Sequence, residues 1–340
     1  MKILVIQTAS IGDVVLITPI LEKLHKWYPD AKLDVCVKKG IEGLFINHPF
    51  LRKVLIWDKS QNKYKNLIRL ANAIRDERYD VVVNCQRFAS SGFLTVYSGA
   101  KQTIGFSKNP FSYLFSKRVK HSISERNTMH EVERNLSLIS HLTGNRTDAI
   151  NCVCTETAEI KLYPSLKDEA KMSPYKTQKY ICIAPTSLWF TKQFPKERWI
   201  ELIEQLDPDL QVYFLGSVTD IGICDEIIEK SKHQKSLNLA GKLSFLESVS
   251  LMRDAYYNLV NDSAPLHFTS ATHAKVIVFF CSTVLGFGFG PRSPHAVIAE
   301  VSEDLSCRPC GLHGHKQCPK GHFKCAMDID LKPIVELIDP

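Results

Sequence analysis

The 340-residue sequence contains no stretch of 18 or more apolar residues, so we expect no helix that spans a membrane. Its apolar N-terminus is interrupted by Gly12 and Asp13, and no small-residue cleavage site follows, which favours a first strand over a signal peptide. Internal repeats of short period and low-complexity tracts are also lacking. These absences predict a globular protein that stays in the cytoplasm.

Helix-turn-helix, zinc-finger and RNP-type signatures are missing as well, so nucleic acid is not the expected partner. The charge is divided unevenly along the chain. Residues 1–150 contain 23 Lys/Arg and 13 Asp/Glu, a net +10, whereas residues 151–340 contain 20 and 23, a net −3. A basic first half indicates an anionic partner for that half, such as an acidic lipid or a phosphorylated glycan, although a solvated basic surface would give the same count.

Eleven cysteines are present, of which seven are scattered, several of them in apolar runs where cysteine behaves as a small hydrophobe. The other four are Cys307, Cys310, Cys318 and Cys325. A Cys-x2-Cys pair followed by two more cysteines is compatible with structural zinc, but the Cys-x6-Cys spacing of the second pair is longer than zinc sites favour. We therefore expect no required metal, with zinc as the alternative to a thiol-rich terminal loop.

Apolar runs of strand length alternate with helical patterns in both halves, which predicts an α/β fold with parallel sheets. The predicted strands are Ile3–Gln7, Lys32–Val37, Lys53–Trp57, Asp80–Asn84, Thr103–Phe106, Tyr180–Ala184, Gln211–Leu215, Leu237–Leu239, Asn258–Val260 and Lys275–Phe280. The predicted helices are Val14–Tyr28, Tyr64–Arg78, Lys196–Gln205, Asp220–Ser231, Ser244–Asp254, Ala264–Thr272 and Leu331–Ile338. The polar stretch 155–178 separates two sets, so we expect doubly wound domains at residues 1–165 and 175–340.

The segment from Ser10 to Pro19 places Asp13 where the first predicted strand turns into a helix. Ligands of α/β folds collect outside the carboxyl ends of parallel strands, and a helix N-terminus favours an ionised carboxylate. Asp13 is thus a candidate general base, and the competing interpretation is an ordinary helix cap.

Two further strand-to-helix clusters lie in the second half. Thr186, Ser187 and Lys192 follow a predicted strand, and hydroxyls with a lysine in such a loop suit a diphosphate. In Asn261-Asp262-Ser263-Ala264-Pro265-Leu266-His267, Asp262 or Ser263 is expected to cap a helix, with His267 on its first turn. Each cluster alone is better explained by a structural role, whereas three that could converge across one cleft favour a site.

With these residues in hand, the chain resembles the ADP-heptose:lipopolysaccharide heptosyltransferase family, glycosyltransferase family nine. The resemblance covers nearly the whole chain, including the terminal CxxC…CP…GH…C segment. Its motifs are Ser10-x-Gly12-Asp13-Val14-Val15 with Pro19, Tyr28-Pro29, Asn47-His48-Pro49, Gly105-Phe106, His130-x3-Arg134, Lys192-x-Phe194-Pro195 with Trp199, and Asn261-Asp262-Ser263 with Pro265 and His267. The chain departs from the family pattern at Phe194, Ala264 and Cys281, where tryptophan, glycine and glycine are commoner.

The resemblance implies a GT-B architecture of two Rossmann-like domains facing a central cleft, and an inverting transfer without a metal. Asp13 would be the base in an acceptor-binding first domain, and the second domain would bind the nucleotide-sugar, with ADP-heptose as the expected donor. The donor-binding residues would be Thr186, Ser187, Lys192, Asp220, Asp262, Ser263, Ala264 and His267. The acceptor-binding residues would be Gly12, Lys108, Lys117, Arg118 and Lys120.

The implied acceptor is a glycolipid of the lipopolysaccharide inner core, and the enzyme would touch the inner face of the cytoplasmic membrane peripherally. Two other functions are weighed against this one. A sugar-nucleotide epimerase of the same architecture would need acid and base groups on both faces of its sugar, and only Asp13 is well placed. A non-catalytic sugar-nucleotide binder predicts loss of Asp13 or Lys192, and both are present.

Overall fold

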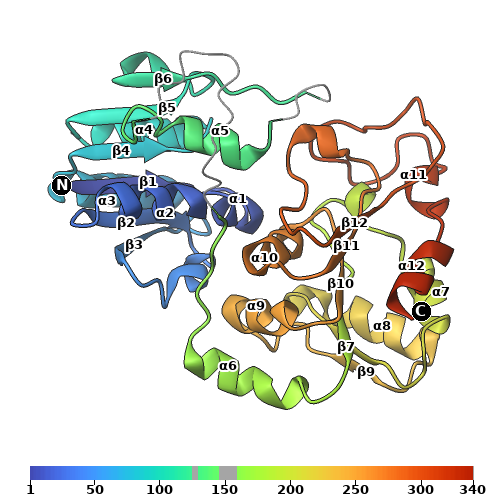
Figure 1. Cartoon of the computed structure of the whole chain (residues 1–340). Coiled ribbons are helices and arrows are strands. Elements are labelled where there is room, and N and C mark those ends of the chain that lie inside the picture. Colours follow the sequence, from blue (N-terminus) through green and yellow to red (C-terminus); the bar gives the residue numbers. More distant parts are fainter. Residues whose placement is uncertain (125–128, 145–158, 340) are drawn as a thin grey trace. The chain divides into compact units, whose positions relative to one another are not determined.

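The computed structural model describes residues 1–124, 129–144 and 159–339 (Figure 1). The chain divides into two compact units. The N-terminal unit comprises the described residues of Met1–Ile123 and Met129–Tyr163, and the C-terminal unit comprises Ser124 and the described residues from Pro164 onward. No helix in the described part of the chain is both long enough and apolar enough to cross a membrane.

The N-terminal unit is built on a six-stranded parallel sheet. Its strands are β1 (Lys2–Ile6), β2 (Lys32–Lys38), β3 (Leu51–Trp57), β4 (Val81–Asn84), β5 (Gln102–Phe106) and β6 (Lys117–Val119). Its helices are α1 (Ile11–Val15), α2 (Thr18–Trp27), α3 (Lys63–Asp76), α4 (Ala89–Tyr97) and α5 (Glu131–Ser137). The strand order is β3-β2-β1-β4-β5-β6.

The C-terminal unit repeats this plan with a second six-stranded parallel sheet. Its strands are β7 (Tyr180–Ala184), β8 (Gln211–Phe214), β9 (Ser236–Asn238), β10 (Tyr257–Asn261), β11 (Val276–Phe279) and β12 (Ala296–Ala299). Its helices are α6 (Leu166–Met172), α7 (Lys196–Glu204), α8 (Ile221–Ser231), α9 (Phe245–Arg253), α10 (Ala264–Thr272), α11 (Lys324–Met327) and α12 (Lys332–Ile338).

Numbered within its own unit, each sheet has the order 3-2-1-4-5-6, which is the Rossmann arrangement. The order reverses between β1 and β4 in one unit and between β7 and β10 in the other. Ligands of such sheets bind in the crevice at this switch point, outside the carboxyl ends of the strands. The prediction of an α/β fold with two doubly wound sheets is confirmed.

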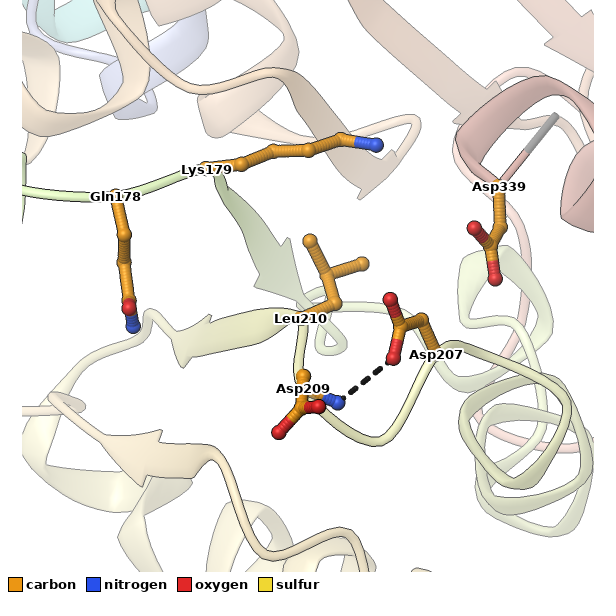
Figure 2. Close-up of a pocket in the computed structure, with 6 residues that line it drawn as sticks. All are labelled: Gln178, Lys179, Asp207, Asp209, Leu210 and Asp339. Atoms are coloured by element: carbon orange, nitrogen blue, oxygen red, sulfur yellow. Dashed lines mark hydrogen bonds between the residues drawn. The ribbon is translucent and has the colours of Figure 1, made fainter.

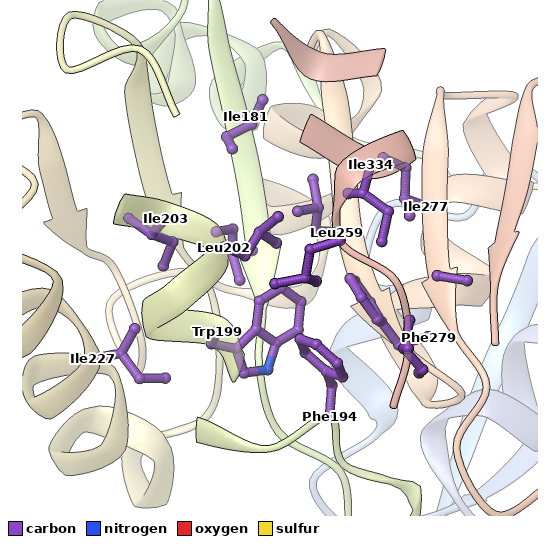
Figure 3. Close-up of a cluster of buried hydrophobic side chains, with 14 of the residues drawn as sticks. Ile181, Phe194, Trp199, Leu202, Ile203, Ile227, Leu259, Ile277, Phe279 and Ile334 are labelled. Carbon is purple, nitrogen blue, oxygen red and sulfur yellow. The ribbon is translucent and has the colours of Figure 1, made fainter. Parts of the chain in front are cut away.

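The central strands are largely apolar because helices cover both faces of a parallel sheet. All four residues from Ile3 to Ile6 of β1 are fully buried. In the C-terminal unit an aromatic group fills the space between β11 and α7 (Figure 3). The ring of Phe194 stacks on Phe279 at 4.2 Å between centroids and meets Trp199 edge-on at 5.1 Å. This core fixes the chain immediately after Lys192.

Several predicted elements differ from those observed. The single helix predicted at Val14–Tyr28 is wrong: α1 ends at Val15, and α2 begins at Thr18. Pro19 has no N–H to continue the first helix, and the Thr18 hydroxyl instead donates to the Val15 carbonyl at 2.9 Å.

Strands β6 and β12 were not predicted, because each is a short edge strand with only partial burial. The polar stretch after residue 158 also contains α6. This helix is stabilised by a capping box of Ser165 and Asp168 and by the Lys171–Glu247 ion pair at 2.8 Å. Residues 155–158 of that stretch, with Cys152 and Cys154, lie outside the described residues.

Candidate active site

Asp13 lies at the switch point of the N-terminal unit, on the third residue of α1. Its Oδ2 accepts hydrogen bonds from the Ser10 N–H at 3.1 Å and the Ser10 hydroxyl at 2.5 Å. The Asp13 N–H donates to the Ser10 oxygen at 3.4 Å, which completes a capping box. The carboxylate is half-buried. It therefore combines the two roles that the sequence left open, a cap and a group at the ligand edge of the sheet.

Thr8 and Gln86 mark the crevice of the same unit. The Thr8 hydroxyl donates to Oε1 of Gln86 at 2.7 Å, and both side chains are buried. Thr8 follows β1 and Gln86 follows β4, the two strands between which the strand order reverses. This hydrogen bond fixes the loop that leads to Asp13.

Lys59 also reaches this loop, and the sequence reasoning missed it. Its ammonium donates to the Thr8 carbonyl at 2.7 Å and lies 4.3 Å from the centroid of the Trp57 ring. Burial, followed by the charges of Lys38 and Lys63, lowers the pKa of Lys59 to about 8. A half-buried cation thus stands at the carboxyl edge of the sheet. The only sequence signal for it is a lysine two residues beyond a predicted strand end.

The predicted acceptor-binding residues are spread over the N-terminal unit. Gly12 is buried within α1. Lys108 and Lys120 are exposed in the segments that follow β5 and β6, at the carboxyl edge. Arg118 is exposed within β6, and Lys117 begins that strand. Burial and then the charge of Lys117 lower the pKa of His141, so Lys117 lies beside a histidine that the site does not use.

The main feature of the C-terminal unit is a largely buried ion pair at its switch point, in which the Lys192 side chain is 17% exposed and that of Asp262 is 8% exposed. The Lys192 ammonium lies 2.6 Å from Oδ2 of Asp262, and the Thr283 hydroxyl donates to the same oxygen at 2.6 Å. Lys192 ends a short 3-10 turn (Phe190–Lys192) after β7, and Asp262 directly follows β10. Asp262 and Thr283 are buried. Loops that follow three adjacent strands thus meet at the Asp262 carboxylate. No pattern in the sequence predicted the role of Thr283.

His267 lies beside this ion pair, buried in the first part of α10. Burial lowers the pKa of His267 to about 4; the charge of Asp262 opposes this shift and that of Lys192 adds to it. The Nδ1 atom is buried and makes no hydrogen bond within the described structure. The imidazole is therefore neutral near pH 7.

The other predicted donor residues lie at the same carboxyl edge of the sheet. Thr186 and Ser187 are half-exposed after β7, where the Ser187 carbonyl accepts a hydrogen bond from the Gln193 side chain at 2.5 Å. Ser263 occupies the N-cap position of α10, but its side chain makes no capping bond, contrary to expectation. Ala264 is the first residue of that helix.

Asp220 belongs to a capping box, and its contact with a ribose stays a prediction. Its Oδ2 accepts from the Ser217 N–H at 2.7 Å and from the Ser217 hydroxyl at 2.6 Å. This capping box precedes α8. The carboxylate stands after β8, one strand away from the switch point.

Asn261 is a structural member of the Asn261-Asp262-Ser263 motif. Its Oδ1 accepts from the Phe194 N–H at 2.7 Å, and its Nδ2 donates to the Ala184 carbonyl at 3.4 Å. The side chain thereby joins the ends of β10 and β7 to the loop that carries Lys192.

The two family-atypical side chains Phe194 and Cys281 both belong to the buried apolar cluster of the C-terminal unit. Cys281 has no exposed surface, and burial raises the pKa of its thiol. These two substitutions therefore alter core packing. Ala264, the third departure, lies at the site itself.

No group of three or more His, Cys, Asp or Glu side chains in the described part of the chain is arranged to hold a metal ion. The expectation of no required metal, with structural zinc at the four terminal cysteines as the alternative, stays a prediction. A pocket of the C-terminal unit lies elsewhere, at the amino ends of β7 and β8 (Figure 2). Its lining residues are Gln178, Lys179, Asp207, Asp209, Leu210 and Asp339. None of the predicted site residues lines it.

Comparisons with known proteins agree with this geometry. Lipopolysaccharide heptosyltransferase 3 of Escherichia coli K12 is 26% identical over 279 residues, 80% of each chain. The solved structure of the E. coli ADP-heptose lps heptosyltransferase II superposes with a TM-score of 0.77 at 19% identity, covering 100% of this chain and 98% of that one. The structure of E. coli heptosyltransferase WaaC with ADP-2-deoxy-2-fluoro heptose superposes with a TM-score of 0.70 at 18% identity, and the match covers 88% of this chain and 93% of that one.

The chain also matches a protein-family profile. Residues 67–322 match the profile of glycosyltransferase family 9 (heptosyltransferase), which is most of the chain. Together with the two Rossmann sheets, this match identifies the architecture as GT-B. The chain belongs to glycosyltransferase family 9, the heptosyltransferases.

Proposed function

We propose that this glycosyltransferase transfers heptose from ADP-heptose to the inner core of lipopolysaccharide, with inversion at the anomeric carbon. The observation that carries the proposal is the largely buried Lys192–Asp262 pair at the switch point of the C-terminal unit. The names of the relatives support the substrates: one is a lipopolysaccharide heptosyltransferase, and another was solved with an ADP-heptose analogue.

On the donor side, Lys192 neutralises the diphosphate as it leaves. Asp262 holds the ammonium at 2.6 Å, so the cation is fixed in place at the edge of the sheet. N–H groups at Ser263 and Ala264 add the positive end of α10. Asp262 contacts sugar hydroxyls, and neutral His267 offers a hydrogen-bonding nitrogen. The hydroxyls of Thr186 and Ser187 contact the phosphates, and Asp220 takes the ribose.

On the acceptor side, Asp13 is the general base. The acceptor oxygen attacks the anomeric carbon, its proton passes to the Asp13 carboxylate, and the bond from that carbon to the diphosphate oxygen breaks. A single displacement of this kind inverts the anomeric centre. Positive charge toward an anionic glycolipid comes from Lys59, Lys108, Lys117, Arg118 and Lys120. Gly12 contributes to the same side of the site, next to Asp13 in α1. No step needs a metal, because Lys192 and α10 balance the charge of the leaving group.

We also propose that the N-terminal unit touches the inner face of the cytoplasmic membrane. Residues 81–124 contain six Lys/Arg and no Asp/Glu. In this segment Phe88, Tyr113 and Leu114 are 64%, 70% and 51% exposed. The Asn109 amide donates to the Phe88 carbonyl at 2.9 Å and so ties the loops that carry them. Exposed apolar side chains within a basic segment suit an anionic bilayer surface.

Calorimetric titration with ADP-, GDP- and UDP-sugars, followed by transfer assays on a heptose-deficient core acceptor, tests the function. Selective binding of ADP-heptose and a product heavier by one heptose are expected. Release of a stereoisomer of the nucleotide-sugar would instead identify an epimerase. Binding without any turnover would identify a non-catalytic binder.

A further inference from the structure

We infer that the segment Cys307–His315, here called the strap, is a functional part of the donor site because it positions both members of the Lys192–Asp262 pair. The inference rests on the proposed donor role of that pair. The strap lies beyond β12 and before α11 in the C-terminal unit (Figure 1). It contacts two loops, one that carries Lys192 and one that carries Thr283.

The first contact is made through Thr191, whose side chain is 1% exposed. Its N–H donates to the His315 carbonyl at 3.1 Å, and its hydroxyl oxygen accepts from the His315 N–H at 2.8 Å. The Ser282 hydroxyl donates to the same Thr191 oxygen at 3.0 Å. The residue immediately before Lys192 is therefore hydrogen-bonded to the strap in both directions.

Gly314 makes this close approach possible. Its φ of +76° is strained for any residue with a side chain. A Cβ at this position would lie 2.8 Å from the Thr191 hydroxyl oxygen, 3.1 Å from Cγ of Lys192 and 3.2 Å from the Ser282 hydroxyl oxygen. A methyl group here would displace the Thr191 hydroxyl, and because Cγ belongs to the Lys192 side chain itself, that side chain would have to shift by a few tenths of an ångström.

The second contact is made through Arg308. One guanidinium nitrogen donates to the carbonyls of Phe280 and Thr283, each at 3.0 Å, and also lies 2.6 Å from a carboxylate oxygen of Glu300. The backbone of Cys310 adds a hydrogen bond to the Ser282 carbonyl at 2.8 Å. Thr283 is the residue whose hydroxyl donates to Asp262. The strap thus holds in place both Thr283, which donates to Asp262, and the loop that carries Lys192.

The strap residues and the binding residues therefore have different roles. Gly314 and Arg308 do not touch the reacting atoms and act as positioning residues for Lys192 and Asp262. Misplacement of a binding group by about 1 Å can cost about a hundredfold in rate. A disturbed strap should therefore raise the KM and Kd for the donor and leave the KM for the acceptor unchanged.

The test compares Gly314→Ala with Gly311→Ala in the full-length protein. Gly311 has a φ of +71°, almost that of Gly314, yet a Cβ there would meet nothing within 4 Å. Both variants carry the same backbone strain, and only Gly314→Ala clashes with the Lys192 loop. Amide hydrogen exchange over residues 189–194 reads the strap contact without any ligand, and calorimetry reads the affinity for ADP.

We expect faster exchange over 189–194 and at least about tenfold weaker ADP binding in Gly314→Ala but not in Gly311→Ala. Equal behaviour of the two variants in both measurements overturns the inference. Faster exchange with unchanged ADP affinity overturns the donor role of the strap. If the wild-type protein binds no nucleotide while exchange differs as expected, the strap contact stands and the proposed donor function fails.

Thr191→Val and Thr191→Ser provide a second test in case Gly314→Ala folds poorly. Valine removes the oxygen that accepts from His315 and Ser282, and serine keeps it. We expect a raised donor KM in the valine variant and near wild-type values in the serine variant. Equal donor KM values in the two variants, with equal thermal stability, contradict the inference.

Discussion

Oδ2 of Asp13 lies 2.5 Å from the hydroxyl oxygen of Ser10, so the carboxylate proposed as the general base is also the acidic half of a capping box. The two roles make different demands. A cap needs an acceptor for the Ser10 N–H, which an amide oxygen supplies as well, whereas a base must take up a proton.

The variant Asp13→Asn separates the role of a cap from the role of a base. The asparagine oxygen still accepts from Ser10 but no longer removes a proton, so kcat should fall about 100- to 10,000-fold. The affinity for ADP-heptose should stay the same, as calorimetry would measure. Ser10→Ala is the control, since it weakens the cap and keeps the carboxylate. Equal losses of kcat in the two variants would mean that Asp13 is only a cap.

Lys192→Met should weaken ADP binding about 10- to 100-fold, because a charge-assisted hydrogen bond to the diphosphate is lost. Lys196→Met is the matched control. Lys196 lies four residues further on and pairs with Glu226 at 2.7 Å, away from Asp262. ADP titration of the three proteins measures the difference, and a similar loss in both variants would speak against a specific role for Lys192.

Thr283→Val should destabilise the C-terminal unit by about 1–3 kcal/mol, because the buried Asp262 carboxylate loses a donor at 2.6 Å. Denaturant unfolding followed by Trp fluorescence measures this change. In the Asp262→Asn background the same substitution should cost less, since no buried charge remains to be stabilised. Additive losses in the double variant would show that the hydroxyl acts elsewhere.

The unfolding free energy should depend on pH through His267. Its pKa is about 4 in the folded protein, against 6.5 for an ordinary histidine. The unfolded chain therefore binds more protons between these values, so stability falls as pH falls from about 6.5 to about 4. The total is about 3 kcal/mol. His267→Gln should flatten this part of the profile of Tm against pH, and an unchanged profile would refute the assignment.

Vesicles of phosphatidylglycerol and phosphatidylethanolamine should bind the protein, and phosphatidylcholine vesicles should not. Phe88→Ser with Tyr113→Ser should lower binding about tenfold, since each side chain buries apolar surface. Tyr64→Ser is the control, because Tyr64 is 76% exposed on α3, outside the basic segment. Co-sedimentation measures vesicle binding by the wild-type protein, the double variant and the control. An equal loss of binding in the control would rule out a specific membrane-binding surface.

Transfer should be unaffected by chelators. Protein purified without chelators should contain less than about one tenth of an equivalent of zinc, given the long Cys318–Cys325 spacing. Metal analysis by mass spectrometry decides this point. One equivalent of zinc would favour the alternative site at the four terminal cysteines.

Much of the fold follows from local sequence patterns, because both sheets are built from buried strands that read as continuous apolar runs. The Ser10–Asp13 and Asn261–Ser263 turns were found for the same reason: they directly follow such runs. The edge strands β6 and β12 were missed because partial burial leaves no such run. The break between α1 and α2 depends on Pro19, whose effect the apolar periodicity concealed.

The supporting residues of the site could not be predicted, because their partners are distant in sequence. Thr283 reaches Asp262 across 21 positions, and His315 reaches Thr191 across 124. Lys59 reaches Thr8 across 51. Periodicity and short motifs report only on neighbours within a few residues. The burial of His267, which decides its protonation state, likewise depends on the packing of the whole unit.

Lys192, Asp262, Thr283, His267 and the strap all belong to the C-terminal unit, whereas Asp13 and the basic segment belong to the N-terminal one. On the proposed function, recognition of the nucleotide-sugar and recognition of the glycan would therefore be encoded in largely separate stretches of the gene. Such an arrangement lets recombination exchange one preference while the other is inherited intact. A single crossover near codon 164 would join an old acceptor preference to a new donor preference without rebuilding either crevice.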